Sequence, residues 1–258
     1  MSADENYYLK MFEAFRRSAR YNEVFDITMS KICKDVKLGC SIASCLAMGP
    51  NKGQCEISFL NHCEVNIRTF VAIERDHASA EYLRESLQSS LPGVESRVIE
   101  TDLKNWQGPG KQIDLILMFH ILYFIRRTER QEFMKKVHDH WLAPGGYLAI
   151  VSACRTKSPG NGYMIFERLG SPALMWEDIE IYLQEAGFTK HYAYEMRVKK
   201  SFENPDESLL RYYQSHVKAP VTFDDVRDAM KQLYPEGKAD EFNMIAIFRK
   251  NKQDSRTK

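Results

Sequence analysis

The pattern of apolar and polar residues divides the chain into helical and extended segments. Near the start, apolar side chains recur at positions 8, 11, 12 and 15, which is the spacing of one helix face, and a second helical stretch follows at 22–34. Beyond these, short apolar runs alternate with amphipathic stretches. The runs predict strands at 41–48, 68–74, 95–101, 112–119 and 146–152, and the stretches predict helices at 54–63, 77–89 and 126–141.

Strands that alternate with helices predict an α/β fold, with a doubly wound and mostly parallel sheet. After residue 152 the alternation loosens, and the pattern predicts a turn-rich loop at 157–162, helices at 175–186, 206–216 and 223–233, and strands at 188–197 and 241–249. A length of 258 residues suits one domain. We expect this domain to span 1–248, with a helical cap at 1–36, a core at 40–152, further cap elements and strands at 153–248, and a flexible tail at 249–258.

Composition argues against several classes of function. The chain has 36 Lys and Arg against 35 Asp and Glu, so its net charge of +1 supplies no field for nucleic acid or an anionic membrane. No apolar run approaches the roughly 20 residues that a membrane span requires. The first residues lack the basic and apolar regions of a signal peptide. We therefore expect a cytoplasmic protein that acts on a small molecule. We also expect it to be a monomer.

The six cysteines carry no metal-binding pattern. They lie at positions 33, 40, 45, 55, 63 and 154, and no two of them form a Cys-x-x-Cys pair. His138 and His140 face different sides of their predicted helix, because residues two apart do not share a face. We expect no metal site, and we expect all six cysteines to be reduced thiols.

The most informative segment is the turn that follows the first predicted strand. The strand stops at Gly49, and the chain passes through Pro50 and Asn51 to Gly53 before it enters a helix. A glycine turn of this kind places backbone N–H groups beside a ligand. The next strand ends at Glu74, whose carboxylate can accept hydrogen bonds from both hydroxyls of a ribose. Together they predict a site for a cofactor that contains a nucleoside.

The same turn departs from the dinucleotide fingerprint Gly-x-Gly-x-x-Gly. Counted from Gly49, the second and third glycines would fall on Asn51 and Gln54, and Pro50 removes one N–H. The pattern therefore favours S-adenosylmethionine, with its methionine part above residues 49–53 and its ribose on Glu74. Thr101 and Asp102, at the end of the third strand, are candidates for contact with the adenine amine, and the fourth strand delivers Phe119 to the ligand-binding edge of the sheet.

A family resemblance adds to these observations. The segments 8–12, 49–53, 121–124, 168–171 and 241–244, together with Glu74, resemble the histamine N-methyltransferase branch of class I, S-adenosylmethionine-dependent methyltransferases. The resemblance implies a Rossmann-like fold with a seven-stranded sheet, a helical N-terminal cap and substrate-binding insertions. It also implies a small amine substrate, histamine or a related imidazole or aromatic amine, enclosed by aromatic side chains.

The resemblance also assigns roles to individual residues. It places His120 where the family has a glutamine beside cofactor and substrate, and Asn243 where a family asparagine contacts the substrate. Tyr21 stands where the family has the glutamate that anchors histamine, with Glu23 two residues on. The expected walls of the substrate pocket are Tyr8, Phe12, Tyr123, Phe124, Tyr163 and Phe166.

The expected reaction is an in-line transfer of a methyl group to a neutral amine, held in place with water excluded. His120 is the candidate proton acceptor, and a structural role for its side chain or a water in its place are the alternatives. Ordinary core packing remains the alternative for Tyr8 and Phe12, whose spacing is helical. Two other functions stay open: a catalytically silent cofactor-binding protein, which the altered loop 50–52 suggests, and a protein methyltransferase.

Overall fold

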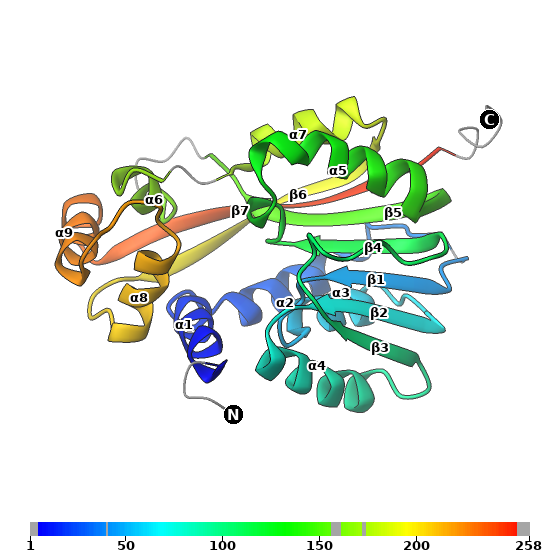
Figure 1. Ribbon diagram of the computed structural model, residues 1–258, viewed down its shortest axis with the longest axis horizontal. Helices are drawn as coiled ribbons and strands as arrows, with labels where there is room; N and C mark the ends of the chain where they lie inside the picture. Colours follow the sequence, from blue (N-terminus) through cyan, green and yellow to red (C-terminus); the bar gives the residue numbers. More distant parts are fainter. Residues whose placement is uncertain (1–4, 40, 156–160, 172–173, 252–258) are drawn as a thin grey trace.

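The computed structural model describes residues 5–39, 41–155, 161–171 and 174–251, and it contains one seven-stranded sheet (Figure 1). The strands lie in the order β3-β2-β1-β4-β5-β7-β6. Their neighbours pair in parallel except at β7, which runs antiparallel between β5 and β6. The mostly parallel sheet of seven strands is confirmed. The strands are β1 Ser44–Met48, β2 Thr69–Glu74, β3 Glu95–Glu100, β4 Ile113–Phe119, β5 Leu142–Ala153, β6 Thr189–Ser201 and β7 Lys238–Arg249.

Helices cover both faces of this sheet (Figure 1). Along β1, Cys45 and Ala47 enter the core shared with α2, α3 and α4, whereas Leu46 and Met48 enter the core shared with α5 and α7. This alternation follows from the two-residue period of a strand, and both faces are apolar because both are covered. The helices are α1 Glu5–Arg17, α2 Tyr21–Ile32, α3 Gln54–His62, α4 His77–Ser90, α5 Arg130–Lys136, α6 Met164–Arg168, α7 Trp176–Glu185, α8 Glu207–Ser215 and α9 Phe223–Leu233.

A third apolar cluster forms a cap beyond the sheet. β6 and β7 extend past the other strands and carry α1, α6, α8 and α9 around their projecting ends (Figure 1). Phe15 of α1 packs there against Tyr212 of α8, with ring centroids 4.1 Å apart. The predicted helical segment 1–36 is therefore divided in two. Within it, α1 belongs to the cap, while α2 packs on the sheet through Phe25 and Met29.

The predicted helix 126–141 is broken into three parts. A 3₁₀ turn at Arg127–Glu129 precedes α5, and a π-helical turn follows at Val137–Trp141. The Lys250 ammonium donates to the carbonyl oxygens of His138, at 2.5 Å, and Leu142, at 3.1 Å, so a distant side chain satisfies the carbonyls of this wide turn. Sequence periodicity within the segment carries no sign of that partner.

Strand β5 begins at Leu142, four residues before the predicted strand 146–152. Leu142 pairs with Ile113, and the register then shifts so that Tyr147 pairs with Leu115. The residues between them therefore bulge from the ladder. Strand β7 runs through Arg249, the first residue of the expected tail, and residues 252–258 lie outside the described part. So do residues 157–160 of the expected turn-rich loop.

The expectation of six reduced cysteines is wrong for one pair. Cys33, just after α2, and Cys63, just after α3, are joined by a disulfide, with their Cα atoms 4.9 Å apart. The packing of α2 on α3 brings together residues that are 30 positions apart, and spacing alone gave no sign of this. Cys45, Cys55 and Cys154 are free thiols and are buried, while Cys40 lies outside the described residues.

Candidate functional site

A cavity of about 920 Å³ opens where β1, β2 and β4 end. β1 lies between β2 and β4, so the chain crosses to opposite sides of β1 at this point, and open α/β sheets bind ligands at such a switch point. The cavity is lined by Gly49, Pro50, Asn51, Glu74, Thr101, Asp102, Phe119 and His120, among others. Seven of the eight residues predicted to bind the cofactor therefore surround one space, and the eighth, Gly53, shapes the loop beside it.

Two glycines give the loop its close fit. Gly49 has φ of +60° and donates its N–H to the Ile73 carbonyl at 2.8 Å, and a Cβ at this position would collide with the Ile121 side chain. Gly53, with φ of +76°, lies against the end of the Leu83 side chain in the same way, so glycine is the residue that fits both positions without strain. Asn51 also adopts the left-handed region, at φ of +53°, which asparagine tolerates better than most residues.

Glu74 joins the loop to the next strand. Its side chain is only 5% exposed, and its two carboxylate oxygens accept the N–H groups of Asn51, at 2.8 Å, and Asp76, at 3.0 Å. Burial raises the pKa of this carboxyl above its usual value. Each carboxylate oxygen keeps a free lone pair after accepting one bond, so both can accept a second hydrogen bond from a ligand that lies in the cavity.

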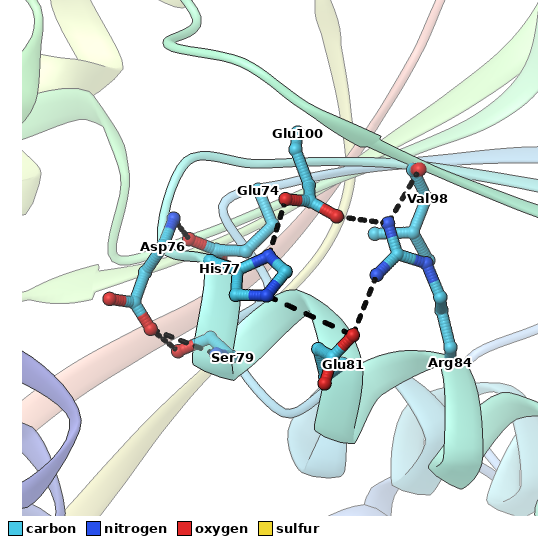
Figure 2. Close-up of polar contacts among 8 residues, drawn as sticks. All are labelled: Glu74, Asp76, His77, Ser79, Glu81, Arg84, Val98 and Glu100. Carbon is cyan, nitrogen blue, oxygen red and sulfur yellow. Dashed lines mark hydrogen bonds and ion pairs between the residues drawn. The ribbon is translucent and has the colours of Figure 1, made fainter. Parts of the chain in front are cut away.

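The surroundings of Glu74 hold the turn between β2 and α4 in place (Figure 2). The Asp76 carboxylate accepts the Ser79 N–H at 2.8 Å and so caps α4. Outside it, the His77 imidazole lies 2.8 Å from the Glu100 carboxylate, which Arg84 also contacts. These two partners lower the pKa of Glu100. The network ties α4 to the edge strand β3 and fixes the turn on which Glu74 sits.

The remaining predicted cofactor residues lie just after β3, for Thr101 and Asp102, and at the end of β4, for Phe119. Thr101 donates its N–H to the Glu74 carbonyl at 3.1 Å. Asp102 accepts the Lys104 N–H at 3.0 Å through one oxygen. Phe119 packs between Phe25 and Phe59, with centroid distances of 5.7 and 5.9 Å, and so closes the floor of the cavity.

His120 stands between this cavity and a second one. Its backbone is strained, with φ of +55°, and its N–H donates to the Val151 carbonyl at 2.8 Å. The imidazole Nε2 lies 2.6 Å from the Tyr21 hydroxyl. Removal from water, together with the nearby Arg16 guanidinium, lowers the pKa of His120 to about 3. The ring is therefore neutral at physiological pH and acts as a hydrogen-bond partner.

The second cavity, of about 720 Å³, lies under the cap. Phe12, Tyr123 and Phe124 border both cavities, while Tyr21, Tyr163 and Phe166 border only the second. Tyr8 borders the first alone, where it stacks on Phe12 at 6.3 Å. Asn243 is fully buried, accepts the Tyr163 hydroxyl at 3.2 Å and lines neither of these cavities. Glu23 instead pairs with Arg20 on the exposed side of α2.

Sequence reasoning missed two residues that face the first cavity, Arg16 and Glu56. Arg16 borders both cavities, and its guanidinium lies 4.9 Å from the Phe12 ring centroid and 4.3 Å from that of Tyr21. Glu56, in the first turn of α3, is 3% exposed, and burial raises its pKa to about 8. The spacing of Arg16 four residues after Phe12 was visible in the sequence, since i and i+4 share a helix face.

The described residues form neither a metal cluster nor a membrane-spanning helix. Among these residues, no cluster of three or more His, Cys, Asp or Glu side chains is arranged to hold a metal ion. No helix among them has the length and apolar character that crossing a membrane requires.

Comparisons with known proteins identify the fold. No protein-family model matches the chain, and no curated protein matches its sequence. A putative methyltransferase from Bacillus halodurans C-125 superposes with a TM-score of 0.63 at 12% identity, over 86% of this chain and 98% of that one. Magnesium protoporphyrin IX methyltransferase from Synechocystis PCC 6803, solved with bound S-adenosylhomocysteine, gives 0.55 at 13%, over 93% and 94%.

A structure with a different activity is also similar. The [4+2]-cyclase SpnF superposes with a TM-score of 0.56 at 12% identity, over 87% of this chain and 80% of that one. Identities this low show a shared fold alone, so the histamine branch remains a prediction. The seven-stranded sheet with its antiparallel β7, covered by helices on both faces, has the Rossmann-like fold of class I methyltransferases.

Proposed function

We propose that this protein is an S-adenosylmethionine-dependent methyltransferase that acts on a small molecule, with an amine as the methyl acceptor. The observation that carries the proposal is Glu74. It is a buried carboxylate bound to the backbone of a glycine loop, at the switch point of the sheet and beside a cavity walled by aromatic rings. The similar Synechocystis methyltransferase, solved with S-adenosylhomocysteine, supports the choice of cofactor.

The residues around the first cavity fit the parts of this cofactor. Glu74 would accept the ribose hydroxyls, and Thr101 and Asp102 would lie beside the adenine. The Arg16 guanidinium can pair with the carboxylate of its methionine part. Burial raises the pKa of the Glu56 carboxyl to about 8, so this group is mostly uncharged at neutral pH and can accept a hydrogen bond from the amino group. When bound, the cofactor supplies a methyl group on a sulfonium, already activated for transfer.

The chain's own contribution is to position the acceptor and exclude water. Aligning two reactants in a closed site can lower a barrier by several kcal/mol without any nucleophilic side chain. His120 and Tyr21 lie at the boundary between the cavities and can bind the acceptor nitrogen by hydrogen bonds. With a pKa of about 3, His120 is too weak a base to hold a proton at neutral pH.

Binding of S-adenosylhomocysteine, measured by calorimetry, tests the cofactor assignment. Glu74→Ala removes a charged acceptor for two hydrogen bonds, each of about 1.5–3 kcal/mol, so we expect the dissociation constant to rise about 100-fold or more. Glu81→Ala is the matched control, because this carboxylate lies on the outer face of α4 and its loss should leave affinity unchanged (Figure 2). Equal affinity in both variants would contradict the assignment.

Transfer of a labelled methyl group to a panel of histamine, other biogenic amines and imidazole compounds tests the reaction. The silent-binder alternative predicts tight cofactor binding without transfer. It rests on the altered loop 50–52, yet the side chains of this loop have partners in the fold: the Asn51 amide donates to Ser79 at 3.0 Å, and Lys52 pairs with Glu13. A protein methyltransferase would instead label proteins and leave the small-molecule panel unlabelled.

The pH dependence of kcat/KM separates the roles of His120. With the ring neutral, we expect no histidine titration between pH 5.5 and 7.5. An inflection near pH 6.5 that disappears in His120→Gln would make His120 the base after all.

A further inference from the structure

The charged side chains around the second cavity are almost all cationic. Only one carboxylate borders it within the described chain, that of Asp178, and this group already pairs with Arg155 at 3.1 Å. The segments 156–160 and 172–173, which adjoin this region in sequence, contain neither Asp nor Glu. The cationic residues that border the cavity are Arg16, Arg127, Arg130, Arg155 and Lys218.

Two of these arginines keep donors available for a ligand. Arg127 is exposed in the turn before α5, and no ion pair or hydrogen bond of its side chain occurs with the residues described. Arg130 donates Nε to the Ile125 carbonyl at 2.9 Å, which leaves its terminal N–H groups. A guanidinium presents a fork that matches a carboxylate with two parallel hydrogen bonds.

The part of the second cavity beside Arg16 and Tyr21 does not suit an ammonium ion. The Arg16 guanidinium already lies over the rings of Phe12 and Tyr21, where a cationic substrate would have to bind. Tyr21 stands where the resembling family has a carboxylate, and burial raises its pKa, so the phenol stays uncharged. His216 borders the same cavity, and burial lowers its pKa, so it adds a neutral hydrogen-bonding group.

We propose that the methyl acceptor is a small aromatic or imidazole compound that carries a carboxylate as well as its nucleophilic nitrogen, with Arg127 and Arg130 binding the carboxylate. A cavity with one sign of charge and apolar walls concentrates ligands of the opposite sign. The aromatic walls accept the ring, and the nitrogen end faces His120 and Tyr21. This inference rests on the proposed function. It changes the expected substrate from a simple amine to an amine that also carries a carboxylate.

Matched pairs of compounds test the inference, because each pair differs only by a carboxylate: histamine and histidine, tyramine and tyrosine, aniline and anthranilate. With S-adenosylmethionine, we expect the acid of at least one pair to have a kcat/KM at least tenfold higher. In calorimetry with bound S-adenosylhomocysteine, the acids should also bind at least tenfold more tightly. Acids that bind no better than their amines, or no binding by any compound, would overturn the inference.

Measuring both transfer and binding distinguishes a failure of this inference from a failure of the proposed function. Transfer that favours the simple amines overturns the inference and leaves the methyltransferase standing. Tighter binding of the acids without any transfer would support a carboxylate-binding site at these arginines, and would count against both the methyltransferase and the role of the acid as methyl acceptor.

The arginines are tested with Arg127→Gln/Arg130→Gln. We expect KM for the preferred acid to rise at least tenfold, kcat to stay within about threefold, and the advantage of acid over amine to disappear. Lys135→Gln is the control, since it removes a charge from α5 at an exposed position that borders neither cavity. An unchanged acid preference in the double variant, with S-adenosylhomocysteine affinity intact, would show that these arginines do not bind the carboxylate.

Discussion

The cavity beside Glu74 and the cavity under the cap are built from different parts of the chain. The first is lined chiefly by the segments at the carboxyl ends of β1, β2, β3 and β4, and in it the loop 49–53 turns over the Glu74 carboxylate, only 23 positions from Asn51. The second is bounded by side chains from α1, α2, α6 and α8 and from the residues after β4 and β5, which span most of the chain. A cofactor site can therefore be specified locally, whereas a substrate site depends on how distant elements pack.

The largest effect should come from the ion pair that anchors the cap. Lys200 and Glu241 are buried, 2.8 Å apart, and the ammonium lies 3.3 Å from the Phe15 ring centroid under α1. Lys200→Met leaves an unpaired buried carboxylate, so we expect the free energy of unfolding to fall by about 3–5 kcal/mol in urea denaturation.

The double variant Lys200→Met/Glu241→Leu is the control for this prediction. Because it removes both charges, it should recover a large part of the lost stability. A double variant as unstable as the single one would show that the loss comes from packing and not from the unpaired charge.

The next largest loss of stability should come from a substitution that strains the backbone of the cofactor loop, residues 49–53. Gly53→Ala forces a Cβ into Leu83 at a positive φ, and we expect a loss of about 2–4 kcal/mol in stability together with weaker S-adenosylhomocysteine binding. Gly93→Ala is the matched control, because its φ is +85° and nothing lies within 4 Å of the added Cβ. It should cost about 1 kcal/mol and leave binding unchanged. Equal losses would show that the contact with Leu83 is unimportant.

The effect is smallest per unit of pH at Glu56, which lines the first cavity near Arg16. Its folded pKa of about 8 lies above the ordinary value, so the folded protein binds more protons than the unfolded one between pH 4.5 and 8. Stability should therefore fall as pH rises through this window, by on the order of 1 kcal/mol per pH unit. We expect Glu56→Gln to lack this contribution, so its stability should exceed that of the unaltered protein at pH 8 and match it near pH 4.5. Identical pH dependence of unfolding in both proteins would contradict the shifted pKa.

The sequence predicted the sheet and its cofactor edge well because their signals are local. A run such as Cys45 to Met48 is apolar on both faces, and only a strand covered on both sides of a sheet satisfies it. Gly49 and Gly53 identified the turn, since positive φ and close contacts leave glycine as the residue that fits. The broken helix at 126–141 was missed because its π turn is satisfied by Lys250, more than 100 residues away.

By itself, then, the sequence determined the α/β order, the glycine loop and the carboxylate that faces it. Only the tertiary structure brought Tyr21 to His120 across 99 positions, paired Cys33 with Cys63, and collected Arg127 and Arg130 around the aromatic cavity. The physical reason is the sequence separation of the residues that interact. Backbone conformation and the burial of a strand depend on neighbouring residues, whereas the charge of a cavity depends on which distant side chains the packing of helices brings to one wall.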